Sequence, residues 1–410
     1  MCGRPHSLAV VLEGLRLTPT LRRRSGKGRS VSVESLVSQL KTGLDAPICL
    51  TWELTYACNL QCVHCLSSSG QRDERELSTA EAKGVLDQLR DLQVFYINIG
   101  GGEPMVRRDF FEIVEHSIGN GIGVKFSTNG AFIDAEKARR LASMDYLDIQ
   151  ISLDGVDAAT NDAVRGIGSY DMARRAMDNL AAANFGPFKI SVVATRHNVP
   201  QLDRFKELAD SYGAQLRLTR LRPSGRGVDT WDDLHPTNAQ QREIYHWLMA
   251  NGENVLTGDS FFHLNALGDS LPGLNMCGAG RVVCLVDPVG DVYACPFVIH
   301  GDFKAGNVRD EGGFAKVWRE SDLFRELREP QSAGACASCG AFDACQGGCM
   351  AAKFFTGLPL DGPDPECVAG DGEVALAELG AQSASTPVSV SFKPRPTPDH
   401  TKPARTPVPA

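Results

Sequence analysis

Two kinds of segment alternate along the chain between residues 48 and 260. Six short apolar runs rich in β-branched and aromatic residues predict strands, namely ICLTWELT, VFYINIGG, GVKFSTNG, LDIQISLDG, KISVVAT and QLRLTRLRP. A stretch with apolar residues at helical spacing follows each run. One of these predicted helices begins with a capping box formed by Ser78 and Glu81. Six consecutive β–α units predict a parallel sheet with helices outside it, either doubly wound or closed into a barrel.

Polar and glycine-rich segments stand where the predicted strands end. They are CNLQCVHC (58–65), GGGEP (100–104), STNG (127–130), SLDG (152–155) and RPSGRG (222–227). Each one alone could be a simple turn. Because ligands bind at the carboxyl ends of parallel strands, their recurrence predicts one shared site, and five such ends converge best on a curved sheet.

The first of these segments contains Cys58, Cys62 and Cys65 with C-x3-C-x2-C spacing. A structural zinc site needs four protein ligands, whereas each of the four irons in a [4Fe–4S] cluster needs one partner outside the cluster. Three cysteines therefore leave one position open. Either a distant fourth cysteine or a bound molecule must complete the site.

Composition narrows the class of protein. The chain has 410 residues, 42% of them hydrophobic, which is enough for one large α/β domain and a smaller one. A net charge of −8 argues against a nucleic-acid partner, and no apolar run approaches the roughly 20 residues of a membrane span or resembles a signal peptide. We therefore expect a cytoplasmic protein, in which 13 cysteines favour metal or cluster sites over disulfides.

Most of the cysteines lie near the C-terminus. Eight of them form two possible sets of four, and they are Cys277, Cys284, Cys295, Cys336, Cys339, Cys345, Cys349 and Cys367. Taken alone, the four from Cys336 to Cys349 could also form a zinc ribbon. Cys49 lies within an apolar strand and is most simply a small buried hydrophobe.

In this order, CNLQCVHC, GGGEP, STNG and SLDG resemble the radical S-adenosylmethionine (SAM) superfamily. The resemblance implies a partial (β/α)6 barrel over residues 44–260, with a [4Fe–4S] cluster on Cys58, Cys62 and Cys65 and SAM chelating the fourth iron. His64 departs from the aromatic residue of many relatives, but its flat ring can preserve the packing. The SAM-binding residues implied are Gly101, Gly102, Glu103, Ser127, Asn129, Ser152, Asp154 and Arg165.

The roles implied for these residues differ. Glu103 and the backbone of Gly101 and Gly102 would receive the methionyl ammonium, since a carboxylate suits that cation. Arg165 could pair with the SAM carboxylate, although a surface ion pair is an equally good reading. One-electron reduction would cleave SAM to a 5′-deoxyadenosyl radical, which a closed barrel interior must confine.

The C-terminal cysteines resemble the SPASM extension, which implies a domain over residues 261–370 with two auxiliary [4Fe–4S] clusters and hence three clusters in total. By this resemblance the first auxiliary cluster is held by Cys277, Cys284, Cys295 and Cys349. The second is held by Cys336, Cys339, Cys345 and Cys367.

Segments such as VFYINIGGGEP, CGAGRVVCLVDPVGDVYACPF and CMAAKFFTGLPLDGPDPEC narrow the resemblance to the mycofactocin maturase family, over about residues 43–370. This implies an oxidoreductase or lyase that decarboxylates the C-terminal Tyr of a Val-Tyr-ending ribosomal precursor peptide and then forms a Val-Tyr carbon–carbon crosslink. It also implies a separate small peptide-binding chaperone and an electron donor such as a flavodoxin or ferredoxin.

Two alternatives remain open, namely another SPASM maturase that forms thioethers or matures sulfatases, and a non-catalytic iron–sulfur or zinc protein. Outside the resemblance, residues 1–43 and the proline-rich residues 381–410 predict disorder.

Overall fold

The computed structural model describes residues 43–252, 254–257, 261–271, 277–329 and 334–385. The predicted N-terminal extension, apart from residue 43, and the tail from residue 386 lie outside the described residues, so their predicted disorder stays a prediction. Ten strands form one sheet in the order β10-β9-β8-β1-β2-β3-β4-β5-β6-β7. The strands are β1 (Cys49–Glu53), β2 (Tyr96–Gly100), β3 (Gly123–Thr128), β4 (Leu147–Ser152), β5 (Lys189–Ala194), β6 (Gln215–Arg220), β7 (Val255–Leu256), β8 (Val283–Val286), β9 (Asp291–Tyr293) and β10 (Lys304–Asn307).

Helices follow the strands, and the six predicted β–α units are confirmed. The α-helices are α3 (Thr79–Asp91), α4 (Phe110–Gly119), α5 (Ala135–Ala142), α6 (Ala158–Arg165), α7 (Ser169–Ala182), α8 (Leu202–Ser211), α9 (Trp231–Leu234), α10 (Asn238–Asn251), α11 (Gly313–Glu320), α12 (Asp322–Arg328), α13 (Phe342–Cys345), α14 (Met350–Phe355) and α15 (Asp371–Ser385). Short 3-10 turns include η1 (Pro104–Val106), η3 (Gly225–Val228) and η4 (Phe262–Leu267). Among the residues described, no helix combines the length and apolar character that a membrane crossing needs.

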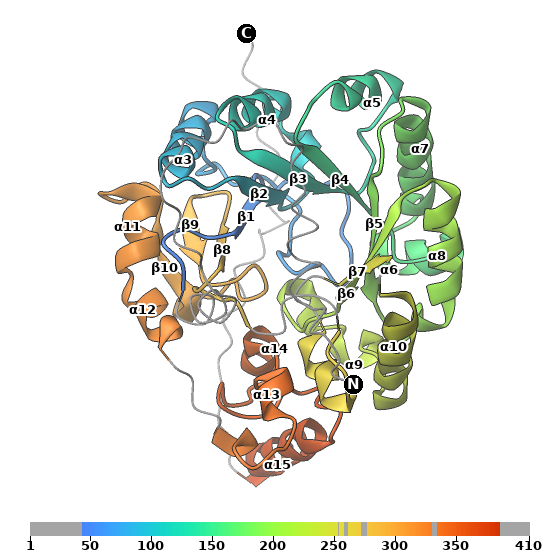
Figure 1. The fold of residues 1–410 in the computed structure, drawn as a ribbon, viewed down its shortest axis with the longest axis vertical. Helices are drawn as coiled ribbons and strands as arrows, with labels where there is room; N and C mark the ends of the chain where they lie inside the picture. Colours follow the sequence, from blue (N-terminus) through green and yellow to red (C-terminus); the bar gives the residue numbers. More distant parts are fainter. Residues whose placement is uncertain (1–42, 253, 258–260, 272–276, 330–333, 386–410) are drawn as a thin grey trace, which may run out of the picture.

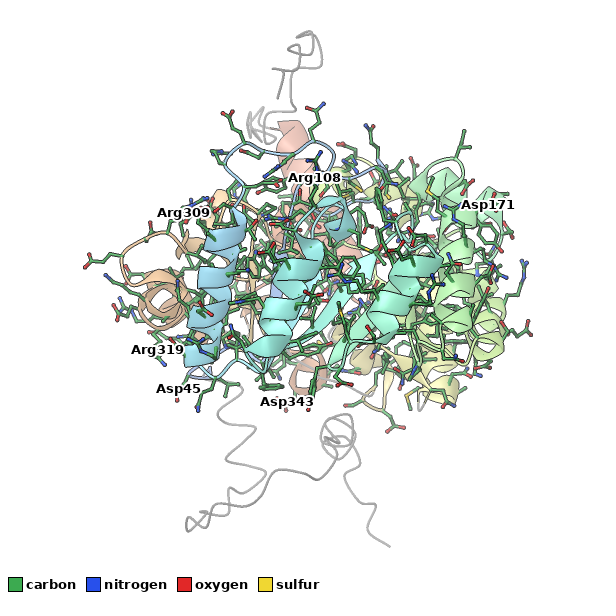
Figure 2. All side chains as sticks on the ribbon, turned by 90° about the horizontal axis from the view of Figure 1, so that it is seen from above. Asp45, Arg108, Asp171, Arg309, Arg319 and Asp343 are labelled. Atoms are coloured by element: carbon green, nitrogen blue, oxygen red, sulfur yellow. The ribbon has the colours of Figure 1, made fainter. Side chains whose placement is uncertain are left out.

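The period of two along each strand gives the sheet an outer face under the helices and an inner face toward the cavity. In β3, Val124 and Phe126 are fully buried under the outer helices, whereas Lys125 and Ser127 point into the lumen. Phe126 meets Phe110 of α4 edge to face, with ring centroids 5.1 Å apart. Figure 1 shows the helices outside the curved sheet, and Figure 2 shows α3, α4 and α5 side by side on this outer surface.

The C-terminal domain continues the barrel sheet instead of standing beside it. Strand β8 pairs in parallel with β1, with Leu50 opposite Cys284, and β9 and β10 follow in antiparallel register. In Figure 1 the helices α13, α14 and α15 lie below the opening of the sheet. The segments on either side of the predicted boundary near residue 260 therefore contribute strands to the same sheet.

Local signals explain where elements begin and end. Ser78 and Glu81 form the predicted capping box of α3, in which each side chain accepts from the other residue's backbone N–H. Helix α15 was not predicted and runs to Ser385, so the prediction that disorder begins at residue 381 is wrong for residues 381–385.

Candidate active site

A cavity of about 660 Å³ occupies the inside of the curved sheet, and the three cysteines of the first motif line it. Six of the eight predicted SAM contacts also line it, namely Gly101, Gly102, Ser127, Asn129, Ser152 and Arg165. The side chains of Glu103 and Asp154 are fully buried behind this wall. The structure therefore brings the predicted site residues together in two shells around one cavity.

The loop that carries the three cysteines is fixed by the end of β2. Gly102 N–H donates to the Thr55 carbonyl at 2.8 Å, and Glu103 N–H donates to the Ala57 carbonyl at 2.9 Å. A Cβ on Gly102 would lie 2.0 Å from the Ala57 carbonyl oxygen. Glycine is required here because two backbone segments touch, and this contact sets the position of Cys58.

The end of β6 holds the same loop from the other side. Arg226 donates from Nε to the Cys62 carbonyl at 2.9 Å and from Nη1 to the Ser69 carbonyl at 2.8 Å. Gly225 has φ +57° and lies so close to the Cys65 carbonyl that a Cβ would approach it to 2.4 Å. Residues far apart in sequence thus hold three thiols at one end of the cavity.

The donor set suits an iron–sulfur cluster. Burial raises the pKa of the Cys58 thiol to about 11, so this thiol would stay protonated at neutral pH without a nearby positive charge. Coordination to a metal supplies that charge and deprotonates the thiol. Cys58, Cys62 and Cys65 would hold a [4Fe–4S] cluster, which would leave one iron without a protein ligand.

Glu103 lies behind the cavity wall and accepts hydrogen bonds from two residues of the β3 strand end. Thr128 Oγ1 donates to its carboxylate at 2.9 Å, and the backbone N–H of Asn129 donates at 2.8 Å. Burial nevertheless raises the pKa of Glu103 to about 7, because the charged form loses hydration. The Asn129 side chain, placed by this contact, donates to Asn59 in the cysteine loop at 2.9 Å.

Asp154 joins two cavity-lining side chains. Its Oδ2 lies 2.7 Å from Arg165 Nε and 2.9 Å from His64 Nε2, and Val193 N–H donates to its Oδ1 at 2.8 Å. Burial opposes ionisation of Asp154, but the charges of Arg165 and His64 hold its pKa below the usual range. Arg165 is 11% exposed, so its ion pair is a buried one and the surface reading is wrong. His64 is more than a packing ring, because it also contacts this carboxylate.

The proposed second auxiliary set surrounds a pocket of about 20 Å³, which is lined by Cys336, Cys339, Cys345 and Cys367. Burial raises the pKa of the Cys345 and Cys367 thiols, with contributions from neighbouring cysteines at Cys345. The SPASM resemblance assigns these four cysteines to one cluster, and that assignment stays a prediction.

The proposed first auxiliary set lies at the β8–β9 hairpin and α14. Cys284 is on β8, Cys295 follows β9, and Cys349 is the N-cap of α14. Burial raises the pKa of Cys277, and the nearby Cys349 raises it further. The Cys349 Sγ accepts a hydrogen bond of 3.3 Å from Nε of Arg222, a cavity-lining residue, so this set is near the central cavity.

A buried ion-pair network, which the sequence analysis did not identify, connects the barrel to the cysteine-rich segment. Arg220 pairs with Asp364 and Glu366, and its Nη1 lies 2.9 Å from Asp364 Oδ2. Asp364 in turn accepts from the Cys349 N–H at 2.7 Å. A hint was present in RLRPSGRG, where Arg220 ends one strand and Arg222 and Arg226 follow it. The acidic partners of Arg220 lie more than 140 positions later and carry no local signal.

Two family profiles and several known proteins match this chain. The Radical SAM superfamily profile matches residues 52–209, and the profile of an iron-sulfur cluster-binding domain, SPASM, matches residues 277–340. "Mycofactocin maturase MftC" of Mycolicibacterium smegmatis is 66% identical over 372 residues, covering 90% of this chain and 92% of that protein. The protein of the same name from Mycobacterium tuberculosis is 69% identical over 347 residues, covering 84% and 89%.

This chain belongs to the mycofactocin maturase family. That result decides between the SPASM families that the sequence left open. The crystal structure of Streptococcus suis SuiB bound to precursor peptide SuiA has the same fold, with a TM-score of 0.66, 18% identity, and coverage of 88% of this chain and 86% of that one. This chain thus shares its overall fold with that protein.

Proposed function

We propose that this protein matures a small ribosomal peptide ending in Val-Tyr, first decarboxylating the tyrosine oxidatively and then joining it to the valine. The relationship that supports this is 66% identity to a mycofactocin maturase across 90% of the chain. The first reaction removes CO2, two electrons and two protons from the tyrosine and leaves an alkene. The second forms a carbon–carbon bond without a net change in electrons or mass.

The proposed cofactors are SAM and three [4Fe–4S] clusters. When bound, SAM supplies a carbon-centred oxidant able to take hydrogen from an unactivated carbon, and the clusters supply electron transfer. Iron and sulfide analysis of the anaerobically reconstituted protein should give three clusters, whereas stoichiometric zinc would count against the second auxiliary set.

The residues around the cavity would bind and orient SAM. The backbone of Gly101 and Gly102 would face the methionyl ammonium, with the carboxylate of Glu103 behind them as its compensating charge. Arg165, held by Asp154, would present its guanidinium to the SAM carboxylate. The hydroxyl and amide groups for the ribose and methionyl ends would come from Ser127, Asn129 and Ser152.

Three further proposals concern partners and location. A separate small chaperone would deliver the precursor peptide, and a flavodoxin or ferredoxin would donate electrons to the cluster at Cys58, Cys62 and Cys65. The site of action would be the cytoplasm, where reduced thiols persist.

Mass analysis of the precursor peptide tests the reaction. Enzyme, chaperone, SAM and reductant are incubated with the peptide without oxygen. We expect a first product lighter by CO2 and two hydrogens, and then a second product of the same mass with a different retention time. A thioether product or an unmodified peptide, with SAM still cleaved, would reject this proposal.

A further inference from the structure

Arg222 lies between the central cavity and the proposed first auxiliary set of cysteines. It follows β6 and lines the cavity, and its Nε donates a hydrogen bond of 3.3 Å to Cys349 Sγ. Phe297 also lines the cavity, and it stands two residues after Cys295 in the chain. This part of the cavity wall is thus built from residues that adjoin cysteines of the set.

Two further contacts hold the guanidinium group of Arg222 in place. Its central carbon lies 3.6 Å from the centroid of the Phe297 ring, which is a cation–π contact. Its Nη1 donates to the carbonyl oxygen of Arg220 at 3.4 Å. Arg222 is only 4% exposed, so water weakens its hydrogen bond to the sulfur little.

The position of Cys349 is fixed as well. Cys349 is the N-cap of α14, and its N–H donates to the Asp364 carboxylate at 2.7 Å. Asp364 is itself held by Arg220, whose Nη1 lies 2.9 Å from its Oδ2. Gly348 allows this close approach, because a Cβ there would lie 2.3 Å from that of Asp364. The donor and the sulfur therefore meet in a defined geometry.

We propose that Arg222 raises the reduction potential of the first auxiliary cluster through its hydrogen bond to Cys349. This inference rests on the proposed function, because it takes Cys277, Cys284, Cys295 and Cys349 as ligands of a [4Fe–4S] cluster. A reduced cluster carries one more negative charge than an oxidised one, so a hydrogen bond to a ligand sulfur stabilises the reduced form more. Arg222 is thus a positioning residue that acts through Cys349.

The place of Arg222 fits the electron transfer that the proposed decarboxylation needs. A hydrogen atom leaves the tyrosine Cβ with the carbon-centred oxidant, and the bond between Cα and the carboxylate then breaks. This releases CO2, forms the alkene and leaves one electron over. That electron needs an acceptor near the cavity, and a higher potential at the Cys349 cluster favours its transfer there.

Two substitutions of Arg222 separate the hydrogen bond from the rest of the side chain. Glutamine places its amide nitrogen where arginine has Nε, so Arg222→Gln keeps an N–H donor at that position and removes the charge. Methionine has a methyl group at the same position, so Arg222→Met removes both the donor and the charge. Arg204→Met, which breaks an exposed ion pair at α8, is the control.

The potential is measured by redox titration of the anaerobic holoenzyme, followed by electron paramagnetic resonance (EPR). The signal that is lost in Cys349→Ala identifies the first auxiliary cluster. In Arg222→Met we expect about tenfold less reduced relative to oxidised cluster at a fixed potential, since a hydrogen bond to a charged group contributes about 1.5 kcal/mol. This corresponds to a potential lower by about 59 mV. Arg222→Gln should stay closer to the wild type, and Arg204→Met should match it.

A second measurement needs no variant at position 222. In wild-type enzyme made with arginine that carries nitrogen-15 at Nε, pulsed EPR of the reduced first auxiliary cluster should show coupling to that nitrogen. Absence of this coupling would overturn the inference. Equal potentials in the wild type and Arg222→Met, both with full iron content, would also overturn it, as would equal potentials in Arg222→Met and Arg222→Gln.

These outcomes are distinct from a failure of the proposed function. If the potential does not depend on Arg222 and the wild type still converts the precursor, the inference fails and the proposed function stands. If Cys349→Ala keeps every cluster signal, the proposed ligand set fails and the inference fails with it.

Discussion

Replacing Gly102 with alanine should detach the end of β2 from the cysteine loop. The added Cβ would lie 2.0 Å from the Ala57 carbonyl oxygen and 2.6 Å from its carbon. Restoring an ordinary contact of about 3.4 Å requires a shift of roughly 1.4 Å between two backbone segments. Such a shift would break the hydrogen bonds from Gly102 and Glu103 to this loop, which are 2.8 and 2.9 Å long.

The expected cost follows from these contacts. Strain of about 1–3 kcal/mol and two lost hydrogen bonds of about 1 kcal/mol each give a loss of about 3–5 kcal/mol in unfolding free energy. Denaturant unfolding of the apoprotein measures it, and iron content after reconstitution reports whether Cys58 still binds a cluster. Gly100→Ala is the matched control, because a Cβ there meets no atom within 4 Å. Equal stability and iron content in the two variants would refute the close-approach argument.

Three further changes have distinct expected outcomes. Arg220→Met should cost about 3–5 kcal/mol in unfolding free energy, because Asp364 and Glu366 stay buried without their cation. The control Arg204→Met, which breaks an exposed ion pair, should cost under about 1 kcal/mol. Equal losses in the two variants would contradict the importance of the buried network. The pKa of Glu103 is about 7 in the folded protein and about 4.3 in the unfolded chain, so the folded state loses stability as this buried carboxyl ionises. Between pH 4.5 and 7 the unfolding free energy of the wild type should fall by roughly 3 kcal/mol relative to that of Glu103→Gln. Parallel pH profiles of unfolding free energy for the two proteins would argue against this raised pKa. Alanine at all three positions of the first motif should abolish 5′-deoxyadenosine formation and keep the absorbance of the auxiliary clusters, and continued SAM cleavage would exclude the assigned cluster site. Those positions are Cys58, Cys62 and Cys65.

The six β–α units could be predicted because their signals are local. Period-two alternation, capping residues and glycine-rich strand ends are all encoded within a few residues of one another. Strand β8 was missed, because VCLV resembles any short apolar run and its parallel partner β1 lies more than 220 residues earlier. Pairing across such a separation has no signature in a single sequence.

The candidate site could likewise be predicted where its signals are local and not where they depend on the folded chain. Spacing alone identified the first motif, and its three thiols do line one cavity. The motifs could not tell that Glu103 and Asp154 lie behind the wall, since burial depends on which side of the strand end the loop turns. Three further cavity-lining residues, Lys125, Lys189 and Arg217, begin the segments KFST, KISV and RLT, but alternation does not reveal which face of a strand is inside.

The central claim is the proposed oxidative decarboxylation of the C-terminal tyrosine, in which the carbon-centred oxidant that SAM would supply takes a hydrogen from the tyrosine Cβ. Its most direct test is a precursor peptide with deuterium at both Cβ positions of the C-terminal tyrosine, incubated anaerobically with enzyme, chaperone, SAM and reductant. Mass analysis of 5′-deoxyadenosine should show one deuterium gained for each decarboxylated peptide. Decarboxylated peptide accompanied by unlabelled 5′-deoxyadenosine would contradict the account. So would a parallel experiment in which a precursor deuterated at the valine, and not at the tyrosine, transfers its label to 5′-deoxyadenosine during decarboxylation.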